Sequence, residues 1–232
     1  MKFAIIGRRF GRNYARLLNE KGVDFIIVTK EDVHKAFNGD IDCVIIASPA
    51  ATHFRYIKKA LNAKKHVLVE KPMVLSSKEA REVKELIGDR VFMVGHQYLY
   101  NDSLLDLVDR IKGGEIGNLK RIKMYHFYPS ARKDIDVYWD AASHGFSVLD
   151  FMGATDKLSK FHVGIGIKYL EWVFSGDRGA LGFNDAPTVE PLEAELDHFI
   201  GCVLNNATPR TDIEHGIRVI ENMEKYETQY TV

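Results

Sequence analysis

Five short apolar runs alternate with amphipathic stretches over the first hundred residues of the chain. The runs are apolar throughout, which is typical of strands buried on both faces, and they cover residues 3–6, 24–28, 42–47, 66–70 and 91–95. The stretches between them have helical periodicity and cover residues 11–21, 51–63 and 77–87. Strands that alternate with helices predict parallel βαβ units. We therefore expect an α/β fold whose N-terminal part is a Rossmann-type doubly wound parallel sheet.

The pattern changes after Gln97. A helical stretch at 102–112 ends at a pair of glycines, and residues 119–128 alternate as a strand does. Farther along, the patterns predict a helix at 143–152, strands within 159–184, and helices at 192–204 and 212–228. We therefore expect two domains, 1–97 and 98–232, the second being a reduced α+β domain with a small, mainly antiparallel sheet.

Composition limits the compartment and the partners. Hydrophobic residues make up 46% of the 232 residues and charged residues 28%, and the 32 basic and 32 acidic residues are intermixed. No broad basic surface therefore favours nucleic acid or an anionic membrane as a partner.

Cys43 and Cys202 lie in apolar runs without zinc or redox spacing, which fits a reducing compartment. The apolar start ends at Arg8, too early for a signal sequence, and no run reaches the roughly 18 apolar residues of a membrane span, so we expect a cytoplasmic protein.

The first turn between a strand and a helix has the features of a phosphate-binding loop. Gly7 ends the strand and Gly11 enters the helix, where free helix N–H groups can hold a pyrophosphate. The middle glycine of a complete G-x-G-x-x-G is missing, so an ordinary tight turn is the alternative. Arg8 and Arg9, which precede Phe10, could bind phosphate bidentately, because positive charge at a helix N-terminus is unfavourable without an anion. Solvated arginines are the simpler interpretation.

The end of the second strand bears on the choice of cofactor. An enzyme specific for NAD carries an acidic residue there for the ribose diol, whereas this chain has Thr29 and Lys30 before Glu31 and Asp32. A Thr-Lys pair favours a 2′-phosphate. We therefore expect NADP(H) or NAD(H) as cofactor, with NADP(H) preferred. The linker to the third strand is too short for a full additional βα unit.

Residues 41–73 contain two elements that are specific in combination, S-P-x-x-x-H at 48–53 and E-K-P at 70–72. Further matches follow in the same order, at 95–101, 112–123, 140–144 and 191–203. The chain thereby resembles the glucose-fructose oxidoreductase and inositol dehydrogenase family of NAD(P)-dependent oxidoreductases, as a short member. Its glycine loop and second βα unit are trimmed. The segment between about 153 and 190 is shorter than the family's large antiparallel sheet, which normally covers the substrate and supports oligomerisation.

The resemblance implies a catalytic lysine with an aspartate and a histidine, here Lys71, Asp140 and His144. In the family the bond between this lysine and Pro72 is often cis, which would direct the ammonium group to the nicotinamide edge. His144 would take the hydroxyl proton, and Lys71 would hydrogen-bond the same oxygen. The alternatives are a solvated lysine, Asp140 as the N-cap of a helix at 143–152, and a structural His144.

The resemblance also implies cofactor contacts near strand ends. Together with the glycine loop, Thr29 and Lys30, the expected set includes Ser48, Pro49, His53, Glu70, Lys71, Pro72 and, with less weight, Gln97. Ser48 could instead only cap the following helix, and Asn101 is expected to cap the helix after Gln97. Four other histidines show no ligand spacing, so we expect no metal and take them as structural or solvated: His126, His162, His198 and His215.

We therefore expect a dehydrogenase or reductase that transfers a hydride between NADP(H) and a secondary alcohol or ketone of a sugar, cyclitol or nucleotide sugar. Its partners would be a sugar-like small molecule and further copies of the chain in a homo-oligomer. One alternative is a non-catalytic dinucleotide sensor or partner protein, since the shortened sheet could leave no substrate pocket. Another is a reductase of a small C=N or C=C compound. The joint presence of Lys71, Asp140 and His144 favours the first function.

Overall fold

The computed structural model describes residues 1–130, 132–183 and 185–230, which fall into two contact units. Met1–Gly95 and Glu195–Ile220 form the first unit, and His96–Ala194 with the chain from Glu221 onward form the second. These units differ from the expected ranges 1–97 and 98–232. The difference arises because the segment around residues 199–211 packs on the first unit: the Phe199 ring lies 6.3 Å from that of Phe3.

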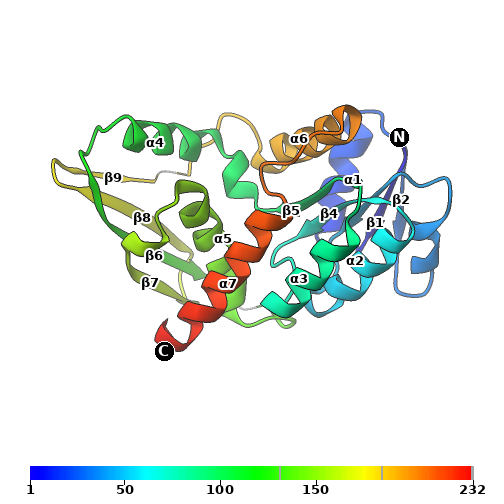
Figure 1. The fold of residues 1–232 in the computed structure, drawn as a ribbon, viewed down its shortest axis with the longest axis horizontal. Coiled ribbons are helices and arrows are strands. Elements are labelled where there is room, and N and C mark those ends of the chain that lie inside the picture. Colours follow the sequence, from blue (N-terminus) through cyan, green and yellow to red (C-terminus); the bar gives the residue numbers. More distant parts are fainter. Residues whose placement is uncertain (131, 184, 231–232) are drawn as a thin grey trace. The chain divides into compact units, whose positions relative to one another are not determined.

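A five-stranded parallel sheet forms the centre of the first unit (Figure 1), as the apolar runs predict. Its strands are β1 (Phe3–Ile6), β2 (Phe25–Val28), β3 (Cys43–Ile46), β4 (His66–Glu70) and β5 (Phe92–Gly95), in the order β2-β1-β3-β4-β5. All four residues of β1, β3 and β5 are buried, because helices cover both faces of the sheet. The strand order reverses at β1, which pairs with β2 on one side and with β3 on the other.

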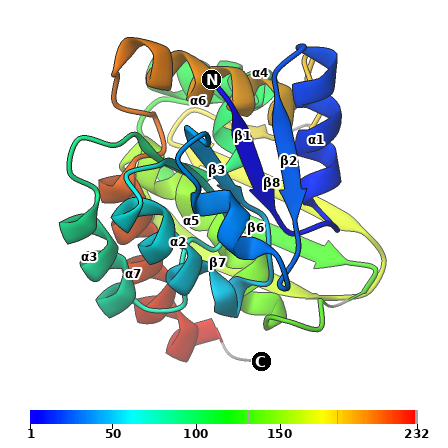
Figure 2. The ribbon, with the colours of Figure 1, turned by 90° about the vertical axis from the view of Figure 1, so that its right-hand side faces the viewer.

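Helices lie on both faces of this sheet (Figure 2). They are α1 (Gly11–Glu20), α2 (His53–Asn62), α3 (Ser77–Leu86), α6 (Pro191–Asn205) and the first part of α7 (Ile213–Tyr230), with short 3-10 turns η1 (Val33–Phe37) and η2 (Ala50–Thr52). An ion pair between Lys21 and Asp197 joins α1 to α6, and one between Lys84 and Glu214 joins α3 to α7. Only η1 stands between β2 and β3, so the linker is too short for a full βα unit, as expected.

The second unit contains a mixed four-stranded sheet in the order β7-β6-β8-β9. Its strands are β6 (Leu119–Tyr128), β7 (Leu158–Ile165), β8 (Tyr169–Gly176) and β9 (Ala180–Gly182), and β6 is parallel to β7 but antiparallel to β8. The other elements are η3 (Gln97–Tyr100), α4 (Asp102–Lys112), α5 (Val137–Met152) and η4 (Thr155–Lys157). Gly145 lets α5 approach the sheet, because a Cβ there would lie 2.7 Å from the Phe161 ring. The expected α+β character is confirmed.

Two capping expectations have different outcomes. Asn101 caps α4, as expected, by accepting a hydrogen bond from the backbone N–H of Leu104. The N-cap of α5 is Asp136, which accepts from the N–H of Tyr138, so α5 begins at Val137 instead of near residue 143. The interpretation of Asp140 as an N-cap is therefore wrong: it lies inside the helix.

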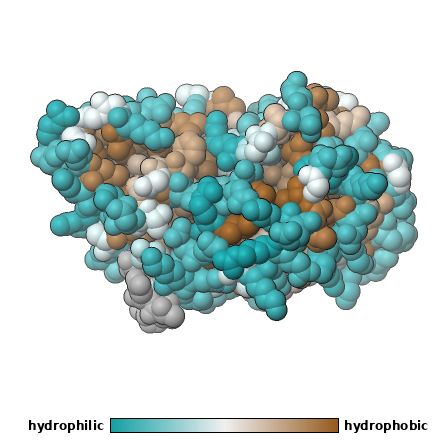
Figure 3. All heavy atoms as spheres, viewed as in Figure 1, coloured by the Kyte–Doolittle hydropathy of each residue, from teal (hydrophilic) through white to brown (hydrophobic). Residues whose placement is uncertain are grey.

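Hydrophilic residues predominate on the face of the molecule seen in Figure 3, with hydrophobic ones in patches between them. Within the described ranges, no helix is both long enough and apolar enough to cross a membrane.

Candidate active site

The carboxyl ends of the five parallel strands lie at one edge of the sheet, and Gly7 occupies the position where the strand order reverses. Ligands of open α/β sheets bind at such a switch point. Gly7 has a φ of +109°, and a Cβ there would lie 2.4 Å from the Ala47 carbonyl oxygen and 2.9 Å from the Ser48 nitrogen. Only glycine fits between the ends of β1 and β3.

The loop at residues 8–10 and the start of α1 carry uncompensated positive charge. The first turn of α1 has no acidic residue and no side-chain cap. Arg8, Arg9 and Arg12 are exposed, and their side chains have no hydrogen bond or ion pair with any residue that the structure describes. A Cβ on Gly11 would lie 2.7 Å from Ile5 Cγ2, so this glycine lets the helix begin close to β1. The arrangement can hold an anion, because helix N–H groups and guanidinium groups lie together.

Thr29 and Lys30 follow β2, and Thr29 forms hydrogen bonds with the carboxylates of Glu31 and Asp32. The Thr29 hydroxyl donates to Glu31 Oε2 at 2.6 Å, and its backbone N–H donates to Asp32 Oδ1 at 2.6 Å. These hydrogen bonds hold the pKa of both carboxyls below the usual range. Lys30 is exposed and has no ion pair among the described residues. The end of β2 thus offers a free ammonium group beside two ionised carboxylates.

His53 connects the segments that follow β3 and β4. Its side chain is fully buried, with Nε2 2.8 Å from the Ser48 carbonyl oxygen and Nδ1 2.9 Å from that of Pro72. Both contacts are hydrogen bonds only when both ring nitrogens carry hydrogen, because carbonyl oxygens only accept. Ser48 Oγ pairs with Thr52 Oγ1 at 2.6 Å and caps no helix, and Pro49 precedes η2. His53 therefore lies behind the edge, where it can hold both segments.

Lys71 is the first residue beyond β4, at the same edge as Gly7 and Ser48, and its bond to Pro72 is cis. Glu70 accepts the Tyr14 hydroxyl at 2.7 Å through Oε1 and the Lys71 backbone N–H at 3.2 Å through Oε2. Tyr14 also lies 3.0 Å from Glu195. The sequence-based reasoning missed Tyr14 and Glu195, although Glu195 could have been noticed as an acidic residue on the apolar face of the helix at 192–204.

Asp140 and His144 lie one turn apart on α5 in the second unit, and both are buried. They share this helix because it begins six residues before the predicted start at 143. Asp140 accepts a hydrogen bond from Arg132 Nη1 at 3.3 Å, and Arg132 also pairs with Asp134 at 2.7 Å. The expected catalytic residues are thus divided between the two units, with Lys71 in the first.

Aromatic rings surround His144 within the second unit. The Tyr98 ring lies 4.9 Å away and perpendicular to it, and the His126 ring lies at 5.7 Å. Burial raises the pKa of the phenols of Tyr98 and Tyr128, with Asp185 and Asp140 as respective secondary causes, so both stay neutral donors. His126 is buried beside His144 on the buried side of the alternating strand 119–128, which is consistent with the interpretation of His126 as a structural histidine. Gln97 starts η3 in the same unit.

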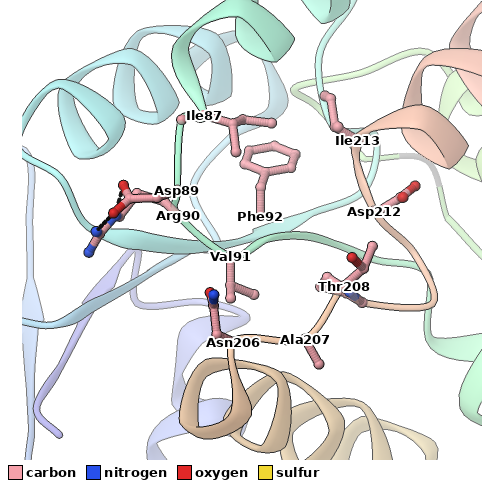
Figure 4. Close-up of a pocket in the computed structure, with 12 residues that line it drawn as sticks. Ile87, Asp89, Arg90, Val91, Phe92, Asn206, Ala207, Thr208, Asp212 and Ile213 are labelled. Atoms are coloured by element: carbon pink, nitrogen blue, oxygen red, sulfur yellow. Dashed lines mark hydrogen bonds and ion pairs between the residues drawn. The ribbon is translucent and has the colours of Figure 1, made fainter.

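A pocket of about 260 Å³ lies at the opposite end of the parallel strands, where β5 begins (Figure 4). Val91 and Phe92 line it together with Thr208 and Asp212. Because ligands of parallel sheets bind at carboxyl ends, this pocket at an amino end is not the cofactor site.

These features define an α/β protein with a Rossmann-type nucleotide-binding sheet and a second, mixed-sheet unit. Residues 27–96 match the model of the oxidoreductase family with the NAD-binding Rossmann fold. An uncharacterised oxidoreductase, YdgJ, of Escherichia coli is 32% identical over 111 residues, 46% of this chain and 32% of that protein. A dTDP-3,4-didehydro-2,6-dideoxy-alpha-D-glucose 3-reductase of Streptomyces violaceoruber is 28% identical over 113 residues, 48% of this chain and 33% of that protein. The matched part spans about a third of these relatives.

The crystal structure of scyllo-inositol dehydrogenase from Lactobacillus casei with bound NAD(H) and scyllo-inositol has the same fold. Its TM-score is 0.80 at 19% identity, covering 99% of this chain and 96% of that chain. Residues 27–96 are thus similar to the glucose-fructose oxidoreductase and inositol dehydrogenase family, whose model they match.

Proposed function

We propose that the chain is an NAD(P)-dependent dehydrogenase or reductase that acts on a secondary alcohol or ketone of a sugar, cyclitol or nucleotide sugar. The observation that carries this proposal is the position of Lys71, one residue beyond β4 at the edge that holds the switch point. Asp140 and His144, one turn apart on α5, supply the remaining acid-base groups. The names of the relatives support a sugar-like substrate.

The residues at the switch point fit a dinucleotide. Gly7 and Gly11 let the end of β1 lie close to the end of β3 and to the start of α1, where a pyrophosphate would bind, and Arg8 and Arg9 can neutralise it. The segment at residues 48–53 would border the same site, with His53 holding it from behind. When bound, the nicotinamide accepts or donates the hydride.

The chain's own residues would move the proton. In oxidation, His144 takes the proton of the substrate hydroxyl, while the Lys71 ammonium group hydrogen-bonds the same oxygen and stabilises its developing negative charge. Asp140, which is paired with Arg132 and lies one turn before His144 on α5, would orient the imidazole. In reduction, the same groups deliver the proton.

The direct test is a panel of sugars, cyclitols and nucleotide sugars with each cofactor, followed by absorbance of the reduced nicotinamide. Turnover of a polyol or keto sugar is the expected result. Turnover only of a C=N or C=C compound, or cofactor binding without turnover of any of the three substrate classes, would contradict the proposal.

NADPH is expected to bind more tightly than NADH by about tenfold, since a charge-assisted hydrogen bond from Lys30 to the 2′-phosphate contributes roughly 1.5 kcal/mol. Lys30→Ala should remove most of this difference. Calorimetric titration of both cofactors measures it, with the exposed Lys59→Ala on α2 as the matched control. Equal or tighter binding of NADH to the unaltered protein would show that the carboxylates of Glu31 and Asp32 dominate instead.

We also expect a homo-oligomer. Gly145 of α5 packs on the sheet face that carries Met124, and the opposite face carries a row of aromatic side chains. Phe127 pairs in register with Tyr169, and Tyr125 with Glu171. Light scattering during size exclusion should give a mass at least twice that of one chain, and Phe127→Glu should lower it. A monomeric mass for the unaltered protein would refute this expectation.

A further inference from the structure

Behind Lys71, three side chains from three elements of the first unit meet around one hydroxyl group. The Tyr14 hydroxyl on α1 lies 2.7 Å from Glu70 Oε1 on β4 and 3.0 Å from Glu195 Oε1 on α6. Tyr14 and Glu195 are both fully buried, whereas Glu70 is half-buried. Gly95 at the end of β5 makes room for the pair of carboxyls, because a Cβ there would lie 3.3 Å from Glu195 Oε1 and 3.4 Å from Glu70 Oε1.

The number of hydrogens in this cluster determines its charge. A phenol has one hydrogen to donate, and a carboxylate has none. Two ionised carboxylates would therefore share one hydrogen in a buried place, where like charges repel strongly and an unpaired charge is costly. Both contacts of the Tyr14 hydroxyl are hydrogen bonds when one carboxyl is protonated and donates to the phenol oxygen, while the phenol donates to the other carboxyl.

Burial identifies the protonated carboxyl as Glu195. Removal from water, and next the charge of Glu70, raise the pKa of Glu195 well above its ordinary value. Its Oε2 has no hydrogen-bond partner among the described residues, which suits a neutral carboxyl better than an anion. Glu70 has the opposite surroundings, since it is partly exposed and accepts the Lys71 N–H. Burial also raises the pKa of the Tyr14 phenol, which therefore stays a donor.

We propose that Glu195 and Tyr14 are positioning residues for Lys71: a protonated Glu195 donates to Tyr14, Tyr14 donates to Glu70, and the Glu70 carboxylate holds the Lys71 backbone N–H. This role rests on the proposed function, because it matters for turnover only if Lys71 contacts the reacting oxygen. The retained proton does not depend on it. The charges that act on Glu195 and Tyr14 are those of the cluster itself, whereas the Lys21–Asp197 ion pair between α1 and α6 involves an exposed carboxylate.

The retained proton is tested without any substrate. Infrared spectra of protein with ¹³C-labelled glutamate should show the C=O band of a protonated carboxyl at pH 7, and Glu195→Gln should abolish it. Asp197→Asn, a neutralisation two residues farther along α6, is the matched control and should leave the band in place. Absence of the band from the labelled wild-type protein at pH 7 would overturn the proposal without reference to any variant.

The pH dependence of stability gives a second readout. The pKa of Glu195 is higher in the folded state than its unfolded value of about 4.3. The stabilisation from its proton is therefore complete below about pH 4.3 and is lost as the pH rises towards the folded-state pKa. The melting temperature of the wild type relative to Glu195→Gln should therefore fall with rising pH, by about 3 °C per pH unit above pH 5. A difference that is constant or rises with pH contradicts a protonated Glu195.

The positioning role is tested with Tyr14→Phe, which removes the hydroxyl and keeps the ring. We expect kcat to fall about tenfold with KM and cofactor affinity within about twofold, because the lost interaction acts on a group used in the transition state. Asp197→Asn should leave kcat unchanged. An unchanged kcat in Tyr14→Phe would refute the positioning role while leaving the proposed function intact. If no substrate is turned over, the proposed function fails and the positioning role falls with it, whereas the infrared band still decides the retained proton.

Discussion

Lys71→Ala is expected to lower kcat by about a hundredfold or more while the affinity for cofactor stays within about twofold. Lys71 follows β4 directly, and its backbone is held by Glu70 on one side and, through Pro72, by His53 on the other. Its ammonium group is proposed to contact the reacting oxygen far more than the dinucleotide. Binding and turnover should therefore separate. Hydride-transfer kinetics beside cofactor titration measure both.

Other variants place this result in context. His144→Ala should lose as much turnover as Lys71→Ala, and Asp140→Asn less, because Asp140 acts through the imidazole. Lys78→Ala, at an exposed position on α3, is the control for removal of a positive charge. Turnover of Lys71→Ala equal to that of the wild type would refute the assigned mechanism even in a working oxidoreductase. If the protein is a dinucleotide sensor instead, none of these changes affects more than cofactor affinity.

Gly7→Ala is expected to lower the free energy of unfolding by about 3 kcal/mol or more and to weaken cofactor binding at least tenfold. Two independent causes add at this position. The φ of +109° disfavours any side chain. The new Cβ would also lie 2.4 Å from the Ala47 carbonyl oxygen, a backbone atom that no rotamer change can move away. The ends of β1 and β3 would have to separate where the pyrophosphate is proposed to bind.

Two other glycines separate these causes. Gly22 has a φ of +63° with no atom within 4 Å of a Cβ, so Gly22→Ala should cost only about 1 kcal/mol from the backbone. Gly11→Ala would meet the Cγ2 methyl of Ile5, a side-chain atom, but has no positive φ, so its effect should lie below that of Gly7→Ala. Urea unfolding measures all three. A cost for Gly7→Ala no larger than that for Gly22→Ala would show that the strand ends adapt.

Much of the fold could be predicted because its signals are local. An apolar run has the same consequence wherever it lies along the chain, so all five strands of the parallel sheet were found close to their bounds. The start of α5 was missed by six residues, since Val137 to Ala142 lack a clear periodicity and Asp136 is one of several possible caps. The membership of residues 195–220 in the first unit was also missed. It depends on long-range contacts such as the hydrogen bond from Thr211 to Val94 at 2.6 Å.

For the candidate site, the strand-helix pattern pointed to Gly7, and the family resemblance pointed to Lys71, Asp140 and His144. The structure places Gly7 and Lys71 at strand ends and the other two residues on one helix, whereas their functional roles stay predictions. The surroundings of these residues follow from contacts between distant segments. Tyr14 bonds to carboxyls 56 and 181 positions away, and no local pattern distinguishes such a tyrosine from an ordinary core residue. The proton proposed for Glu195 exists only because folding removes this carboxyl from water and places it beside Glu70. Sequence patterns thus specify which chemical groups stand at the ends of strands and on one face of a helix, whereas the burial and the neighbours that set their charge arise when the helices pack on the sheet.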